Sequence, residues 1–151
     1  SNEGVLKITD PKMTRFNITL NEGVEMVIWA LINAIGGEIF VPKISSFKIT
    51  DLAEAIGPKC EKNIIGIRPG EKIHEEMITT ADSYSTIDLG NYFAILPMDG
   101  ILKRKYINNK IEFNDFEIGK SYSSSSNKSF LDVDELRKLI IENIDSKFKP
   151  Q

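Results

Sequence analysis

Residues 19–78 alternate between apolar patterns of helical and of extended type. The clearest helical pattern runs from Thr19 to Gly37 and predicts a helix with one buried face, because apolar side chains recur three and four positions apart. These side chains are Val24, Val27, Ile28, Leu31, Ile32 and Ile35. Thr19 and Glu22 have the spacing of a capping box, with Asn21 as a rival cap, and Gly36 with Gly37 can form the left-handed turn that ends the helix.

Shorter segments of both kinds follow this helix. The stretch "EIFVP" predicts a buried strand that Pro42 closes, and residues 45–57 predict a second helix, with Ser45 or Ser46 as its cap. "NIIGI" reads as another strand, and residues 69–78 as a short helix with Pro69 in its first turn. The order helix, strand, helix, strand, helix is typical of an α/β layer.

The remaining residues predict three further features. "NYFAILP" is a third strand candidate, and "GILKRKYINNKIEF" predicts two strands around Asn108 and Asn109, which form an appended β-hairpin. The polar run Ser123–Ser126 predicts a loop. The last stretch, "FLDVDELRKLIIENI", predicts a helix with a capping box and with its inward side chains at Val133, Leu136, Leu139, Ile140 and Ile144.

These patterns divide the chain into three regions of one domain. We expect a small mixed α/β subdomain over residues 1–97 and a β-hairpin extension over 98–120. Residues 121–151, the serine-rich loop and the last helix, pack on the same domain, because one helix is too little for a second core.

Composition and charge exclude several classes of function. The net charge is −3 and the basic residues are scattered among acidic ones, so we expect no nucleic-acid partner. The longest apolar stretch, Met26 to Ile35, is about half of what a membrane span needs, and no signal peptide is visible at the start. Cys60 is the only cysteine, which excludes an intrachain disulfide and a cysteine-based zinc cluster and suits a reducing cytoplasm.

Arg68 occupies an unusual place, between the apolar run "IIGI" and the predicted helix that follows. A helix that begins where a strand ends directs unpaired N–H groups and a positive dipole end to one spot, which suits a phosphate. The arginine adds a planar fork that can hold two phosphate oxygens, and Glu71 could reach the backbone or the hydroxyls of a ligand. The alternative is a solvent-facing arginine that pairs with a nearby carboxylate.

Three separated motifs give the chain a family resemblance. "DPKMTRFNITLNEGVEMV", "EIFVPKISSFKITDLAEAI" and "IRPGEKIHEEMI" resemble, in this order, the carboxyl-terminal part of the UDP-N-acetylglucosamine 4,6-dehydratases. These are extended short-chain dehydrogenase/reductase enzymes of bacterial surface-sugar synthesis. The resemblance runs from Lys7 to Ile78, weakens through "NYFAILP" and returns in "YSSSSNKSFLDVDELRKLI", while residues 98–120 match nothing in the family. Asn17 stands where the family often has an aromatic residue.

The resemblance implies a division of labour. In such enzymes an amino-terminal Rossmann domain binds NADP or NAD and holds the catalytic residues, and the smaller carboxyl-terminal part covers the nucleotide-sugar. It also implies that Arg68 contacts the diphosphate of a UDP-sugar, that Glu71 contacts the ribose, and that Arg15 approaches the phosphates.

The chain itself lacks the signatures of the chemistry. No G-x-G-x-x-G occurs, and Gly36-Gly37 follows a helix where a dinucleotide fingerprint follows a strand. The one Tyr-x-x-x-Lys match, Tyr106 and Lys110, falls in the predicted hairpin and not on one helical face. His74 lacks the second histidine of a zinc helix. We therefore expect no catalytic, cofactor or metal site in this chain.

The sequence thus predicts the substrate-binding part of a UDP-N-acetylglucosamine 4,6-dehydratase, cytoplasmic and inactive by itself. Its expected partners are a UDP-sugar, the missing Rossmann domain and further copies in a homo-oligomer. Two alternatives stay open: a non-catalytic oligomerisation module, and part of a related UDP-sugar epimerase or dehydratase. The pattern does not decide the sugar, inversion or retention at C5, or the pathway (capsule, flagellin glycan or O-antigen).

Overall fold

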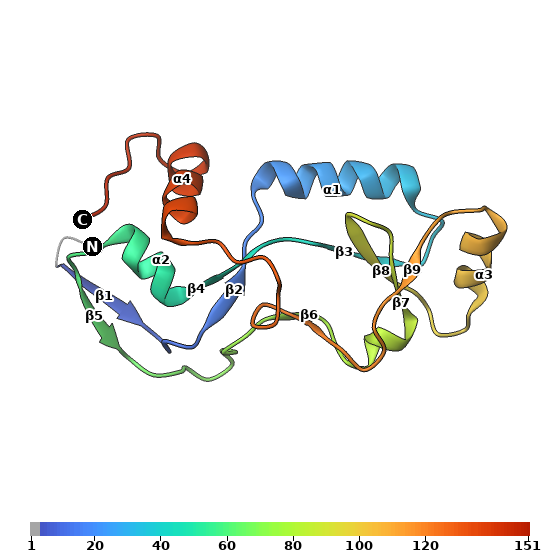
Figure 1. Cartoon of the computed structure of the whole chain (residues 1–151), viewed down its shortest axis with the longest axis horizontal. Helices are drawn as coiled ribbons and strands as arrows, with labels where there is room; N and C mark the ends of the chain where they lie inside the picture. The colour runs from blue at the N-terminus through green and yellow to red at the C-terminus, as the bar shows by residue number, and fades with distance from the viewer. Residues whose placement is uncertain (1–3) are drawn as a thin grey trace. The chain divides into compact units, whose positions relative to one another are not determined.

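A computed structural model describes residues 4–151, which form two compact units, each built from separate stretches of sequence (Figure 1). Unit 1 comprises the described residues up to Asn17 together with 45–75 and 124–151, and unit 2 comprises 18–44 and 76–123. Residues 1–3 of the predicted region 1–97 lie outside the described residues. Both units combine helices with small sheets, so the predicted mixed α/β class is confirmed.

Unit 1 contains two strand pairs and two helices. Its elements are β1 (Val5–Ile8), β2 (Thr14–Phe16), β4 (Ser46–Lys48), α2 (Ile49–Ile56), β5 (Glu61–Ile64) and α4 (Val133–Asn143). β1 and β5 pair in parallel, and β2 pairs antiparallel with β4. Helix α2 packs against both β1 and α4. The buried apolar side chains are Ile8, Met13, Ala53, Ala55 and Leu136.

Unit 2 is built around an antiparallel sheet in the order β3-β8-β7-β9. Its elements are α1 (Leu20–Asn33), β3 (Ile39–Pro42), β6 (Glu76–Ile78), a 3₁₀ turn (Asp82–Ser85), β7 (Thr86–Asp88), β8 (Tyr92–Ile95), α3 (Ile101–Asn108), β9 (Asn114–Asp115) and β10 (Tyr122–Ser123). β6 pairs with β10 apart from this sheet. The main core cluster contains Ile87, Ala94, Leu96, Leu102 and Tyr106.

Several predicted elements and boundaries are confirmed. Thr19 caps α1 and forms the reciprocal capping box with Glu22, and Asp132 caps α4 in the same way. The predicted strands at "EIFVP" and "NYFAILP" are β3 and β8, "NIIGI" overlaps the end of β5, and the helix over 45–57 is α2. Gly36 and Gly37 both have positive φ, as a turn after α1 requires.

The burial predicted for the helix of residues 19–37 is wrong for five of its six apolar side chains. Trp29 stacks against Phe40 of β3 and Tyr92 of β8, with ring centroids 5.1 and 4.5 Å apart, so α1 lies along the sheet (Figure 1). Of the six side chains expected to face inward, Ile35 packs against the core cluster as predicted, whereas the other five point elsewhere. Their exposed fractions are 49% for Val24, 60% for Val27, 54% for Ile28, 80% for Leu31 and 77% for Ile32. The helix therefore uses its aromatic side against its own unit.

The predicted hairpin over residues 98–120 is also wrong, because α3 forms there. Leu102 and Tyr106, four positions apart, are both buried on one face of α3, and the Asp99 carboxylate accepts the N–H of Ile101 at the start of the helix. Lys110 then takes a left-handed conformation with φ of 55°. Helical burial of two side chains thus overrides the weak Asn-Asn turn signal.

Two smaller expectations also differ from the structure. α2 begins after Lys48 without a side-chain cap, because Ser46 lies buried in β4 and its backbone bonds to Ser129 and Leu131. Among the side chains predicted to face inward from the last helix, Leu136 of α4 is buried, whereas Ile144, the C-cap residue after α4, is 81% exposed.

Candidate functional site

The loop of residues 68–75 carries the predicted site, and the helix predicted over 69–78 does not form. Gly70 has φ of +85°, outside the helical region, and the chain turns until β6 begins at Glu76. The carbonyl groups that a helix would use internally bond to other parts of unit 1. The prediction of a helix over these residues is therefore wrong, and Pro69 offers no helix N-terminus to a phosphate.

Arg15, on β2, holds this loop. Its Nη1 donates to the carbonyl oxygens of Thr14 at 2.7 Å and Ile73 at 3.1 Å, and its Nη2 donates to that of Lys72 at 2.9 Å. Its Nε lies 3.5 Å from a carboxylate oxygen of Glu75. The backbone N–H of Thr14 also donates to the carbonyl of Ile73. The loop therefore lies beside β2 and is bonded to it much as an irregular neighbouring strand would be.

A buried hydroxyl network supports the far end of the loop. The Thr14 hydroxyl lies 2.7 Å from that of Ser124 and 2.8 Å from Nδ1 of His74. Ser124 Oγ accepts the N–H of Glu75, and the N–H of Ser124 donates to the carbonyl of Glu75. Thr14 and Ser124 are 5% and 0% exposed. Buried hydroxyl groups with several partners restrict a backbone to one conformation.

Arg68 and Glu71 form a closed turn at the outer end of the loop. Nε of Arg68 donates to Glu71 at 2.8 Å, and the Arg68 N–H donates to the same carboxylate at 3.0 Å. These hydrogen bonds, with the positive charges of Arg68 and Arg15, hold the pKa of Glu71 below its usual value. The Arg68 side chain is 69% exposed. Of its nitrogen atoms, Nη1 has no hydrogen-bond partner within residues 4–151.

The three predicted site residues therefore belong to one loop and its support, all within unit 1. Arg15 and Glu71 are close enough for the charge of Arg15 to act on the Glu71 carboxylate. The arrangement presents an exposed guanidinium on a fixed turn. Such a group can bind an oxyanion if the oxyanion displaces part of the Glu71 contact.

Sequence reasoning missed the residues that fix this loop. Thr14, His74 and Ser124 lie far apart in the sequence, so no spacing rule connects them. Ser124 is completely buried, whereas Ser125 and Ser126 are exposed, and nothing in a run of four identical serines distinguishes Ser124 from these two.

The other titratable candidates have structural partners. The Tyr106 hydroxyl donates to Glu38, and burial, followed by the charge of Glu38, raises the pKa of Tyr106. Lys110 lies beyond the end of α3. Cys60 is half-buried beside Gly57. The described part of the chain contains no cluster of three or more acidic, histidine or cysteine residues that could hold a metal ion, and none of its helices has the length and apolarity to cross a membrane.

Comparison with curated proteins gives relatives that are similar to this chain over most of its length. The chain is 42% identical over 144 residues to the UDP-N-acetylglucosamine 4,6-dehydratase (inverting) of Campylobacter jejuni. The matched region covers 89% of this chain and 42% of that protein. The chain is 35% identical over 144 residues to the UDP-glucose 4-epimerase of Rickettsia akari, covering 90% of this chain and 40% of that one. The chain thus spans about two fifths of the length of these relatives.

A solved structure shows the same fold. The X-ray structure of Pen from Bacillus thuringiensis matches 93% of this chain and 40% of its own, with a TM-score of 0.73 and 27% identity. A family model described as "Polysaccharide biosynthesis protein" matches residues 1–97. These residues include β2 with Arg15, the loop of residues 68–75 and three strands of the larger sheet, β3, β7 and β8. The chain belongs to this polysaccharide biosynthesis protein family.

Proposed function

We propose that this chain is the substrate-binding, carboxyl-terminal part of a UDP-N-acetylglucosamine 4,6-dehydratase that works in the cytoplasm on bacterial surface glycans. Arg68 binds the diphosphate of the UDP-sugar and Glu71 the ribose hydroxyls. Arg15 fixes the loop and adds positive charge beneath it. The similarity to the Campylobacter jejuni dehydratase supports the reaction class, and the same homo-oligomeric assembly is expected as in the family.

The exposed guanidinium of Arg68 on a braced turn is the observation that carries the binding role. Arg15 and Ser124 fix the loop from beneath through backbone contacts, so the position of the turn does not depend on a ligand. A preformed site loses less conformational entropy when a ligand binds. The contact between Arg68 and Glu71 is solvent-exposed and hence weak, so a doubly charged diphosphate can compete for the guanidinium.

The family resemblance implies NADP or NAD, and the residues of this chain do not fit such a cofactor. No G-x-G-x-x-G is present. In residues 4–151, the strand that leads directly into a helix is β4 before α2, without a glycine-rich turn between them. We therefore assign the nicotinamide and the acid/base residues to the remainder of the parent enzyme, and we expect no turnover by this chain alone.

Calorimetric titration of the chain with UDP tests the binding role. Replacing Arg68 with alanine removes a charge-assisted contact of about 1.5 to 3 kcal/mol, so we expect at least a tenfold loss of affinity. Arg104→Ala is the matched control, since Arg104 is an exposed arginine of unit 2 and its loss should leave the affinity unchanged. Equal affinities for the unmodified chain and the Arg68 variant would refute the assignment.

Two other functions have a specific observation in their favour. The similarity to the Rickettsia akari protein named UDP-glucose 4-epimerase favours a related UDP-sugar enzyme, which would bind UDP through the same loop but belong to a parent with a different product. The exposed apolar side chains, among them Ile144 just after α4, favour a non-catalytic oligomerisation module. An assembly module would show a larger mass in light scattering that falls in an Ile144→Asp variant, with UDP binding insensitive to Arg68.

A further inference from the structure

The outer face of α1 is apolar and uncovered within its unit. It consists of Leu20, Val24, Val27, Ile28, Leu31 and Ile32, of which Leu20 is 83% exposed and Val24, the least exposed, 49%. At 3.6 residues per turn these side chains form one continuous stripe, on the side away from Glu22 and Asn33 and bordered by Glu25. We call this stripe the α1 outer face.

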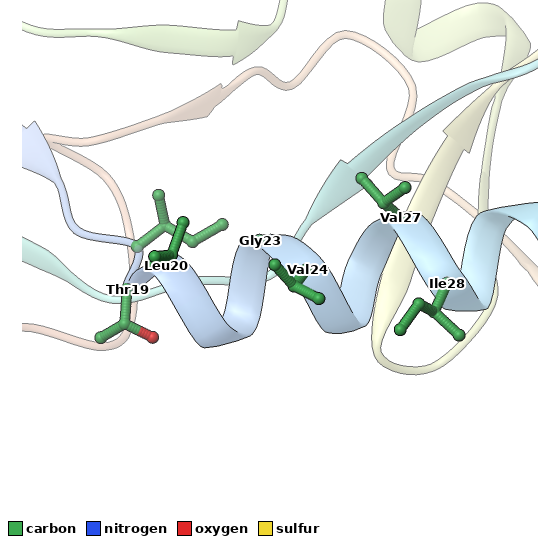
Figure 2. A pocket seen from close by; sticks show the side chains of 7 residues that line it. Thr19, Leu20, Gly23, Val24, Val27 and Ile28 are labelled. Atoms are coloured by element: carbon green, nitrogen blue, oxygen red, sulfur yellow. The ribbon is translucent and has the colours of Figure 1, made fainter.

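An apolar hollow lies at the first half of this face. Its volume is about 450 Å³, and it is lined by residues of unit 2 that begin with Ile18 and end with Ile28. Figure 2 shows Val24 and Ile28 one turn apart on the same side of α1, projecting away from the ribbon. Gly23 also lines the hollow, and a Cβ added to Gly23 would meet no atom within 4 Å.

The composition of α1 is typical of a helix that is buried both on its Trp29 side and on its outer face. Residues 26–32 are apolar without interruption, and a helix that is apolar nearly all round belongs inside a protein. Trp29 accounts for one side, through Phe40 and Tyr92. A glycine in a helix interior weakens the helix. Gly23 is therefore explained if another backbone approaches the hollow closely.

The size of the face argues for an occupant joined to this chain. α1 has 14 residues, so its length is about 21 Å, and one face of such a helix is much smaller than the roughly 800 Å² per partner of a stable interface between separate proteins. A covalently linked segment needs less area, because its effective concentration is high. The curated relatives carry such additional chain, since this one spans only 42% of the Campylobacter jejuni protein.

We propose that the α1 outer face is the surface on which the remainder of the parent enzyme docks, with the hollow at Gly23 receiving one of its backbone segments. This inference rests on the proposed function, because it assumes a longer parent. Unit 1 also has an uncovered element, the parallel pair of β1 and β5. β5 is exposed along its whole length, and the chain continues from it into the exposed side chains of Ile65 and Ile67. Parallel strands in folded proteins are normally covered on both faces.

The test compares thiol labelling in two proteins. One is the 151-residue chain, and the other is a chimera in which this chain replaces the matching 144-residue region of the Campylobacter jejuni dehydratase. Both carry Cys60→Ser and either Leu31→Cys or Asn33→Cys. Asn33 is the matched control, because it is exposed on the same helix about 200° away from Leu31.

We expect the thiol at position 31 to react at least tenfold more slowly in the chimera than in the chain, and the thiol at position 33 to react equally in both. Gly23→Ala should raise the melting temperature of the chain and lower that of the chimera. Equal labelling of position 31 in both proteins overturns the proposal. Protection in the chain alone, with a doubled mass in light scattering, also overturns it and identifies a second copy as the occupant.

If the chimera is insoluble, the chain is mixed with the separate remainder of the Campylobacter jejuni protein, and the same outcomes decide. The readout needs no sugar nucleotide. Equal labelling of position 31 together with the expected loss of UDP affinity in the Arg68 variant would refute the interface and leave the proposed function intact. Protection of position 31 without that loss of affinity would refute the proposed function and leave the interface intact.

Discussion

Replacing Arg15 with methionine tests whether this side chain fixes the loop of residues 68–75. Methionine keeps the aliphatic stem and removes the guanidinium. Two of the lost hydrogen bonds join β2 to the loop, at Ile73 and Lys72. The third, to Thr14, is local and adds little.

The magnitude follows from these contacts. Hydrogen bonds to charged groups contribute about 1.5 to 3 kcal/mol each, and the Arg15 side chain is 24% exposed, so water replaces part of what is lost. The contact with half-exposed Glu75 adds under about 1 kcal/mol. We therefore expect the free energy of unfolding to fall by about 2 to 4 kcal/mol. Arg15→Lys should lose most of the same amount, because an ammonium cannot reproduce the fork.

Urea unfolding followed by far-UV circular dichroism measures this loss, since Trp29, the only tryptophan, lies in unit 2 and does not report on Arg15 directly. Hydrogen exchange of the Thr14 amide, which donates to Ile73, shows whether the loop has detached. Arg104→Met is the control and should stay within about 0.5 kcal/mol. A loss under about 0.5 kcal/mol for Arg15→Met, with Thr14 still protected, would refute the bracing role.

Two further variants test other contacts. Ser124→Ala removes one of the two partners of the buried Thr14 hydroxyl and leaves the N–H of Glu75 without its acceptor, so it should lower the free energy of unfolding by about 1 to 3 kcal/mol in urea titrations; an effect no larger than that of the exposed-site variant Ser126→Ala would contradict the network. Glu38→Gln tests a pH dependence: although burial opposes ionisation, hydrogen bonds from backbone N–H groups and Tyr106 keep the Glu38 pKa below its ordinary value of 4.5. The stabilisation is therefore complete above pH 4.5 and is lost as the pH falls through the lowered folded value, so melting temperatures from neutral to acidic pH should decline less in the glutamine variant; parallel declines would argue against it.

The N-termini of α1 and α4 were predictable from sequence because their signals are local. The capping boxes of α1 and α4 each involve two residues three positions apart, and both form as the spacing predicts. The strands β3 and β8 were also found, since each is a short apolar run next to a turn residue. The mixed α/β class follows from these elements alone.

The loop of residues 68–75 was not predictable, because its conformation depends on distant partners. Ile73 in this loop and Met77 just after it have helical spacing, and nothing local opposes a helix except Gly70. The decisive contacts come from Arg15 and Ser124, which satisfy the carbonyl groups of Lys72, Ile73 and Glu75. The same cause explains why Arg68 and Glu71 were identified as a pair of interest while the residues that support them were missed.

Helix α1 shows that an apolar pattern predicts which face of a helix is apolar but not which partner covers it. The spacing of Val24, Ile28 and Leu31 identifies a face that must leave water, but it does not say what covers that face. In this chain the sheet takes the side with Trp29 instead, because aromatic rings on β3 and β8 meet it there. An uncovered apolar stripe of this length is typical of an interaction surface. Under the proposed docking of the α1 outer face, the burial prediction that fails for this chain becomes a prediction about the longer parent enzyme.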